Sequence, residues 1–183
     1  MNKIVKNALI LAAFSLVLGF VLGAVYKITE GPIAEATRKK EMEAYKVVFE
    51  NADDFTELEV DPATADMPTD VINKVFVAID ADGNPLGHVV QLTTKDGYSG
   101  GIIMVVGITN EGVVNGFSVT AHSETSGLGT KAFEPAYADQ FKGIDAAAVS
   151  DVATISGATL TSTAVINGIN AAVEYTNNLG GAQ

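Results

Sequence analysis

The stretch GIIMVVGITNEGVVNGFSVT, residues 101–120, contains two apolar runs that are rich in β-branched side chains. The runs are 101–108 and 113–120, and the polar segment TNEG at 109–112 separates them. Apolar runs of this length around a short turn that contains glycine are typical of a β-hairpin.

A second hairpin is predicted just before the first one. The segments VFVAID (75–80) and LGHVVQL (86–92) flank ADGNP at 81–85, which has the composition of a tight turn. Two successive hairpins favour an antiparallel sheet. The acidic, aperiodic segment 51–70, with its two prolines, is predicted to be a loop.

Helices are predicted on both sides of these strands. Residues 132–142 and 162–178 follow the strands with helical spacing of apolar residues. Residues 28–50 precede the strands as another helix, with Pro32 near its start. Strands followed by helices, without βαβ alternation, predict an α+β domain: an antiparallel sheet of hairpins with packed helices.

The most apolar segment is NALILAAFSLVLGFVLGAVY at 7–26, which has no charge and lies between Lys6 and Lys27. About 20 apolar residues suffice to cross a hydrocarbon core of ~30 Å. A cleaved signal peptide has a shorter apolar core, and a buried helix of a globular domain usually shows a polar face. We therefore expect residues 1–27 to form a single transmembrane anchor and residues 28–183 to form one domain.

The charges bear on which side of the membrane this domain lies. The chain has 11 basic and 22 acidic residues, and only Lys3 and Lys6 precede the span, so 9 basic and 22 acidic residues follow it. Basic residues occur at both ends of the span, so the positive-inside rule gives no clear orientation. The short N-terminus and the acidity of everything after the span favour an N-in orientation, with the domain outside the cytoplasm.

Composition excludes several classes of function. The chain has no cysteine, which excludes disulfides, iron–sulfur ligation and cysteine nucleophiles, and its only histidines are His88 and His122, which disfavours a zinc site. A formal net charge of −11 argues against a nucleic-acid partner, since phosphate backbones bind basic faces. Redox chemistry in this chain would therefore need a bound organic cofactor.

Residues 155–163, ISGATLTST, open the last predicted helix. The seven residues 156–162 carry four hydroxyl side chains: Ser156, Thr159, Thr161 and Ser162. Capping of the first free N–H groups would need one or two of them. The remaining hydroxyl groups are also consistent with a phosphate-binding site, and Gly157 would let a phosphate come close to the backbone. The N–H donors and the dipole of a helix N-terminus attract such an anion.

Two glycine-containing segments come earlier in the chain. Residues 122–131, HSETSGLGTK, lack the spacing of a Walker or dinucleotide-binding loop, so a plain connection is the simpler interpretation. Residues 97–101, GYSGG, formally match the G-x-S-x-G nucleophile elbow, which would make Ser99 a nucleophile with His122 as its base. That motif needs a helix after the serine, whereas a β-like run follows here.

Three segments occur in order after the anchor: DGYSGG at 96–101, HSETSGLG at 122–129 and SGATLT at 156–161. In this combination the chain resembles the FMN-binding subunits of respiratory membrane complexes over essentially its whole length. Length and order favour the G subunit of the Rnf ion-translocating ferredoxin:NAD oxidoreductase. The C subunit of the sodium-translocating NADH:quinone oxidoreductase is similar but usually longer.

The resemblance implies a covalent cofactor. In that family FMN is joined through its phosphate to a threonine of an S/T-G-A-T motif, which corresponds to Thr159, with Thr161 as the competing hydroxyl. The resemblance also implies cofactor-binding roles for Ser156, Gly157, Ala158, Leu160, Tyr98, Ser99, Glu124, Thr125, Gly127, Leu128, Gly129 and Lys131. Of these, Lys131 is expected to stabilise either the reduced ring or the phosphate.

The chain departs from the family pattern in two places. The family loop commonly reads E-T-P-G-L-G, and Ser126 replaces the proline, which should loosen the loop. An acidic residue often lies a few positions before the attachment motif. Here Ala153 and Thr154 occupy those positions and Asp151 is the nearest acid, which should weaken flavinylation.

The implied function is an electron-transfer subunit that relays electrons between neighbouring subunits of a bacterial or archaeal membrane complex. No catalytic or metal-binding side chain is implied, and a flavin transferase would attach FMN outside the cytoplasm. Two alternatives stay open. A membrane-tethered binding or assembly subunit, in which the hydroxyls only cap a helix, predicts a colourless protein; a hydrolase predicts labelling of Ser99 by a serine-directed phosphonate.

Overall fold

The computed structural model describes residues 3–61, 65 and 67–180. The chain divides into two compact units, Met1–Lys40 and Glu41–Gln183. The boundary between the units falls inside one helix, α1 (Lys3–Val48). The first unit is therefore a helical segment, and the second is a domain that includes about the last two turns of α1.

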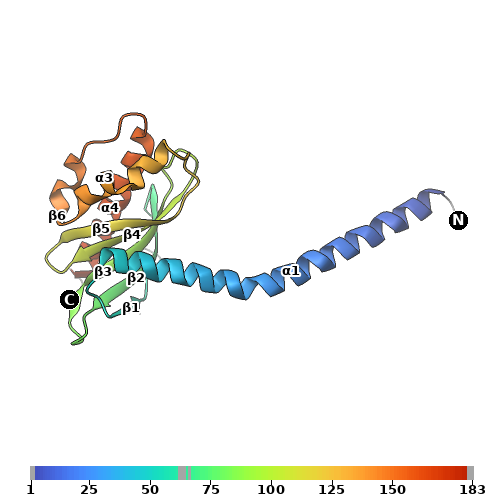
Figure 1. Ribbon diagram of the computed structural model, residues 1–183, viewed down its shortest axis with the longest axis horizontal. Coiled ribbons are helices and arrows are strands. Elements are labelled where there is room, and N and C mark those ends of the chain that lie inside the picture. The colour runs from blue at the N-terminus through green and yellow to red at the C-terminus, as the bar shows by residue number, and fades with distance from the viewer. Residues whose placement is uncertain (1–2, 62–64, 66, 181–183) are drawn as a thin grey trace. The chain divides into compact units, whose positions relative to one another are not determined.

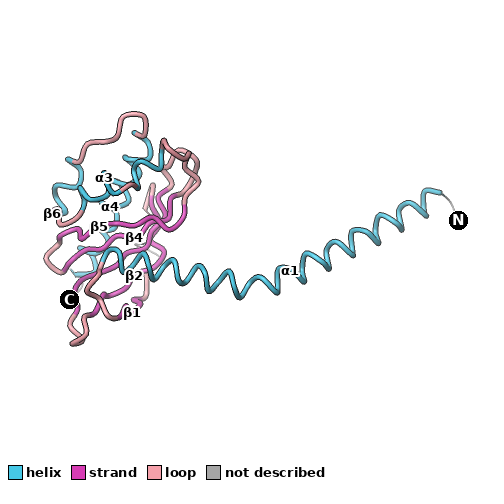
Figure 2. Tube along the Cα trace, viewed as in Figure 1, coloured by secondary structure: helices cyan, strands magenta, loops and turns pink. Residues whose placement is uncertain are grey.

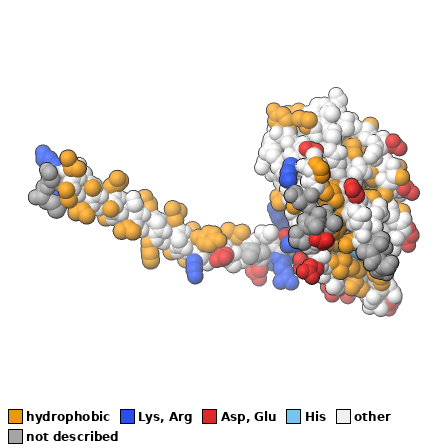
Figure 3. Space-filling model, turned by 180° about the vertical axis from the view of Figure 1, so that it is seen from behind, with side chains coloured by type: hydrophobic (Ala, Val, Ile, Leu, Met, Phe, Trp, Pro, Cys, Tyr) orange, Lys and Arg blue, Asp and Glu red, His pale blue; other side chains and the backbone are white. Residues whose placement is uncertain are grey.

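The first unit contains the apolar part of α1. Its most apolar 18-residue window has a mean hydropathy of 2.6, and none of that window is buried. Figure 3 shows the apolar side chains exposed along this helix. By length and composition the segment can cross a membrane. The sequence predicts Pro32 near the start of a separate helix, whereas it lies inside α1, because the two expected helices form one continuous element.

The domain is built on a six-stranded antiparallel sheet in which every strand pairs with its neighbour in the chain. The strands are β1 (Asp54–Leu58), β2 (Asp70–Ile79), β3 (Pro85–Thr94), β4 (Ile102–Thr109), β5 (Val113–Ala121) and β6 (Ile144–Asp145). Figure 2 shows them in magenta. The predicted α+β class and the antiparallel hairpins are confirmed.

Two predicted elements are wrong in part. The segment 51–70 is not wholly a loop, because it contains β1, an edge strand without a fully buried side chain. Residues 62–64 and 66 of that segment lie outside the described residues. The single helix predicted at 132–142 is instead three short pieces, which are η1 (Gly129–Phe133), α3 (Pro135–Ala138) and η2 (Asp139–Phe141). The physical reason is Pro135, because the residue before a proline is driven out of the helical conformation, and Glu134 is extended (φ −71°, ψ 148°).

One face of the sheet packs against α4 (Thr159–Gly180), which corresponds to the helix predicted at 162–178. Leu92, Met104 and Val106 point to this side and are buried with Val165 and Ile169 of the helix. The short η3 (Ala146–Asp151) also packs on α4. This face holds the larger core, and its packing holds α4 in place on the sheet.

The opposite face of the sheet holds the end of α1. Tyr45, Val48 and Phe49 are buried there together with Val105, which points away from α4. The approach is close at Gly107, where a Cβ would lie 2.9 Å from the Cβ of Val48. The sheet of the domain therefore lies between two helical layers, α4 and the end of α1 (Figure 1).

Polar contacts fasten this end of α1 to the sheet. Glu41 accepts hydrogen bonds from Lys74 at 3.0 Å and from the buried Gln91 at 3.2 Å. The side-chain amide of Asn115 donates to the carbonyl of Val48, which is one of the helix-terminal carbonyls that lack a partner within the helix. The end of α1 is thus part of the domain's core.

Candidate functional site

The last helix, α4, begins at Thr159, directly after a tight turn. Gly157 in this turn has a φ of +84°, which favours glycine. The backbone N–H groups of Thr159, Leu160 and Thr161 have no acceptor in the described part of the chain. Free N–H donors at a helix start, together with the helix dipole, attract an anion.

The hydroxyl side chains at this helix start have different surroundings. Ser162 closes the turn with two hydrogen bonds. Its Oγ accepts from the N–H of Ile155 at 3.1 Å and donates to the carbonyl of Ala158 at 2.8 Å. Thr161 is only 2% exposed, and its Oγ1 donates to Oε2 of Glu124 at 2.8 Å. Thr159 is exposed, and its hydroxyl has no hydrogen-bond partner among the described residues. The hydroxyl of Ser162 therefore stabilises the turn before α4, whereas no hydrogen bond in the described part of the chain uses the hydroxyl of Thr159.

Glu124 joins three segments that are far apart in the sequence. Its side chain is 8% exposed, and besides the bond from Thr161 its Oε1 accepts from the N–H of Ser99 at 3.3 Å. Gly97 and Gly129 press against the same carboxylate, since a Cβ at Gly97 would lie 2.8 Å from Oε1 and a Cβ at Gly129 would collide with Oε2. The carboxylate thus holds the 97–101 turn and its own loop against the start of α4.

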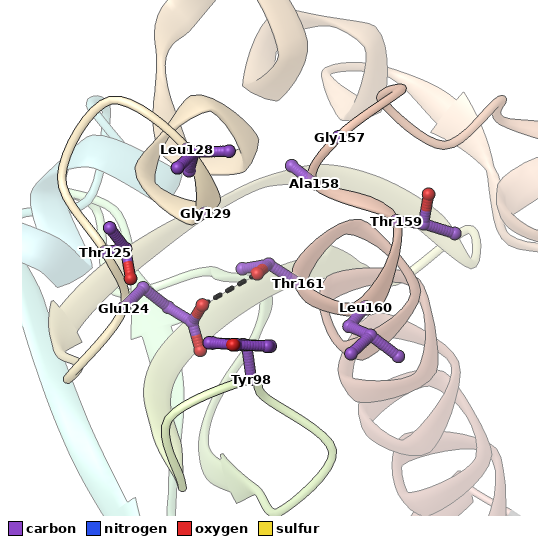
Figure 4. Close-up of a pocket in the computed structure, with 10 residues that line it drawn as sticks. All are labelled: Tyr98, Glu124, Thr125, Leu128, Gly129, Gly157, Ala158, Thr159, Leu160 and Thr161. Carbon is purple, nitrogen blue, oxygen red and sulfur yellow. Dashed lines mark hydrogen bonds between the residues drawn. The ribbon is translucent and has the colours of Figure 1, made fainter.

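A cavity of about 440 Å³ lies where these segments meet. Its lining residues, drawn in Figure 4, are Tyr98, Glu124, Thr125, Leu128, Gly129, Gly157, Ala158, Thr159, Leu160 and Thr161. All of them are among the residues for which the sequence analysis predicts a cofactor-binding role. Ser99, Gly127, Ser156 and Lys131 share that prediction and do not line the cavity.

Three large apolar side chains are exposed around the cavity. Tyr98 is 70% exposed, Leu128 52% and Leu160 58%, and Figure 4 shows them on different sides of the site. Beyond α1, the described residues have no other exposed large apolar side chain. Apolar side chains gathered around a hollow mark a binding surface for an apolar or aromatic ligand.

Known proteins resemble the chain over both of its parts. Residues 97–174 match the FMN-binding domain family, and residues 1–48 match the RnfG N-terminal region. The G subunit of the ion-translocating oxidoreductase complex of Methanosarcina acetivorans is 30% identical to this chain over 95% of both proteins. The chain belongs to the family of G subunits of ion-translocating oxidoreductase complexes. The predicted family is thereby confirmed.

Other members and a solved structure show further similarity. The G subunit of the proton-translocating ferredoxin:NAD(+) oxidoreductase complex of Clostridium ljungdahlii is 29% identical over 98% of this chain and 94% of that protein. The crystal structure of Shewanella oneidensis NqrC is 20% identical, covers 73% of this chain and 74% of that chain, and has a TM-score of 0.48. In this G subunit, the part of the chain that matches the FMN-binding domain family, residues 97–174, includes every described residue that lines the cavity.

The alternative of a serine hydrolase has no support in the geometry. No hydrogen bond joins Ser99 and His122 in the part of the chain that the structure describes. Instead, Nδ1 of His122 accepts from the N–H of Glu124 at 3.2 Å, and the imidazole ring lies 4.9 Å from the ring of Phe133. Strand β4, and not a helix, follows Ser99.

One tie between the elements of the site was missed in the sequence analysis. The side-chain amide of Asn167 donates to Oδ2 of Asp96 at 3.1 Å, which fastens the turn before Tyr98 to α4. A weak signal exists in the sequence, because Asn167 interrupts an apolar run of the predicted helix. The contact itself is not predictable from the sequence, because Asp96 lies 71 positions before Asn167 in the chain.

Replacing Ser126 with proline is expected to stabilise the domain by about 0.4–1 kcal/mol. The N–H of Leu128 donates to the carbonyl of Thr125 at 3.2 Å, and Gly127 has a φ of +75°. A positive φ at the third position defines a type II turn, in which proline is favoured at the second position. Thermal unfolding of the full chain in detergent should show a higher midpoint for Ser126→Pro and no change for Ser126→Ala. A lower midpoint for the proline variant would contradict this turn geometry.

Proposed function

We propose that this chain is an electron-transfer subunit of a membrane-bound ion-translocating ferredoxin:NAD oxidoreductase complex. We further propose that it carries FMN covalently, through a phosphoester to Oγ1 of Thr159. The observation that carries the proposal is the exposed, unbonded hydroxyl of Thr159 at the free N–H groups of a helix start, on the wall of a cavity within the FMN-binding match.

The surroundings of the two candidate threonines favour Thr159 over Thr161. A transferase must reach the hydroxyl that it modifies, and Thr159 is exposed whereas Thr161 is buried. The hydroxyl of Thr161 is also committed to Glu124. Modification of Thr161 would require breaking that bond and leaving a buried carboxylate oxygen without its donor, which is costly.

The start of α4 suits the linking phosphate. A phosphodiester keeps one negative charge, and the free N–H groups of Thr159, Leu160 and Thr161 together with the dipole of α4 stabilise a charge at this position. Gly157 lines the cavity without a side chain, so a phosphate can come close to the backbone there. The net bond change is an ester between Thr159 and the phosphate of FMN, with the loss of one water relative to the free partners.

The cavity suits the ring system of the cofactor. Tyr98, Leu128 and Leu160 offer exposed apolar surface on which a planar aromatic ring can pack. When bound, the isoalloxazine ring supplies the electron-accepting and electron-donating chemistry. The side chains of the cavity bind and orient the ring, and none of them needs to act as an acid, a base or a nucleophile.

The proposed setting is a membrane, with the span at 7–26 as anchor and residues 28–183 as the domain outside the cytoplasm. The exposed apolar helix supports the anchor, and the placement of all 22 acidic residues after the span supports the orientation. The partners would be other subunits of the same complex, which exchange electrons with this one. A flavin transferase would be a further partner during maturation.

Mass spectrometry tests the cofactor directly. The full chain, produced together with a flavin transferase, should gain a mass equal to FMN minus water on the peptide that contains Thr159. The peptide should be yellow and fluorescent, because a covalent flavin survives denaturation. A chain without any such adduct after co-production would contradict the proposal and leave a tethered binding or assembly subunit.

A further inference from the structure

Among the described residues that line the cavity, Glu124 is the only one with a charged side chain. The described lining residues include no lysine, arginine or histidine, and Lys131 is exposed on η1 and is not among them. Within the described lining, the positive charge nearest in kind to a counter-charge for this carboxylate is the partial charge at the start of α4. The phosphate that links FMN to Thr159 would be stabilised by the same partial positive charge.

Two hydrogen bonds hold the carboxylate of Glu124 at the cavity wall. Its Oε2 accepts from the hydroxyl of Thr161 at 2.8 Å, and its Oε1 accepts from the N–H of Ser99 at 3.3 Å. The group is nearly buried, so it is far less screened by water and salt than a surface charge. A fixed negative charge of this kind acts strongly on whatever occupies the cavity.

We propose that Glu124 lowers the reduction potential of a flavin held in this cavity, through its charge and not through a bond to the cofactor. The inference rests on the proposed function. Full reduction of a flavin ring near neutral pH takes up two electrons and one proton, so the ring gains one negative charge. The electrons come from a neighbouring redox centre of the complex and the proton from water. A carboxylate beside the ring opposes that gain.

This inference concerns Glu124 and gives the wall a charge opposite to that of Lys131, which is expected to stabilise either the reduced ring or the phosphate. A cation beside the ring would stabilise the reduced, anionic form and raise the potential, but the cavity wall supplies an anion. The site is therefore built to hold electrons weakly and to pass them on. Thr161 and Ser99 act as positioning groups, because their hydrogen bonds hold the carboxylate of Glu124 at the wall.

The test is a redox titration of the flavinylated full chain in detergent, followed by the visible absorbance of the flavin. Glu124→Gln keeps the shape of the side chain and removes its charge, so the midpoint potential should become more positive. The matched control is Glu111→Gln, which removes the same charge from an exposed turn outside the cavity and should leave the potential unchanged. Added salt should not abolish the difference, because the charge is buried.

A second pair of variants covers the case in which Glu124→Gln does not fold. The exposed side chain of Thr125 lines the cavity, so Thr125→Lys should raise the potential and Thr125→Glu should lower it. Flavinylated variants that all keep the wild-type potential would overturn the inference and leave the proposed function standing. A wild-type chain that never acquires covalent flavin would overturn both.

Discussion

The Thr159→Ala variant, produced together with a flavin transferase, will carry no covalent flavin. The variant lacks the only hydroxyl of the T-L-T segment that is both exposed and without a hydrogen-bond partner. The expected loss is complete, because no other hydroxyl among the described lining residues is both exposed and located at the free N–H groups that start α4. A fluorescent band on a denaturing gel measures the outcome, since only covalent flavin remains bound there.

Thr161→Val is the matched control for this variant. It removes the competing hydroxyl two residues along the same helix and leaves Thr159 in place. We expect a fluorescent band of normal strength on the gel, together with a lower melting temperature, because Glu124 loses one of its donors. Fluorescence that persists in Thr159→Ala and disappears in Thr161→Val would move the attachment to Thr161, while the electron-transfer function would stand.

Removal of the end of α1 is expected to abolish folding of the domain. Tyr45, Val48 and Phe49 are buried against one face of the sheet, and each such side chain contributes roughly 1.5–3 kcal/mol. Their sum approaches the total stability of about 5–15 kcal/mol that is typical of a domain. A fragment of residues 41–183 should unfold cooperatively, whereas a fragment of residues 51–183 should aggregate or remain unfolded.

The two fragments differ only in residues 41–50, so the comparison isolates the packing of that segment. Circular dichroism during heating and gel filtration give the measurements. A soluble 51–183 fragment with the same melting temperature as 41–183 would show that the end of α1 is dispensable. The same result would contradict the close fit of Val48 at Gly107.

Local patterns in the sequence predict much of this fold, and pairing over long distances accounts for what they miss. The two central hairpins are visible because their runs are apolar and their turns contain glycine. Strand β1 is not visible, because an edge strand without a buried face has no periodicity, and only its partner β2 makes it a strand. The broken helix at 132–142 has a local cause, Pro135, whose effect on Glu134 the spacing of apolar residues does not show.

The site divides in the same way. The S-G-A-T-x-T segment and the glycine loops are short motifs that carry the family resemblance, and that resemblance names all the described residues of the cavity wall. The bond between Glu124 and Thr161 is not predictable, because 37 residues separate its partners and nothing local specifies it. The role of Lys131 stays a prediction: it follows the same loop in the sequence and is not among the described residues that line the cavity.

The order of the strands bears on when the cofactor can be attached. Each strand pairs with the strand made just before it, so the sheet can grow progressively as the ribosome delivers the chain. The cavity wall closes only when α4 docks, because Thr159 is on α4 and its opposite wall comes from much earlier residues. If FMN is attached to Thr159 as proposed, its site is complete only after the whole domain has folded, so a flavinylated chain is one whose cavity has already formed.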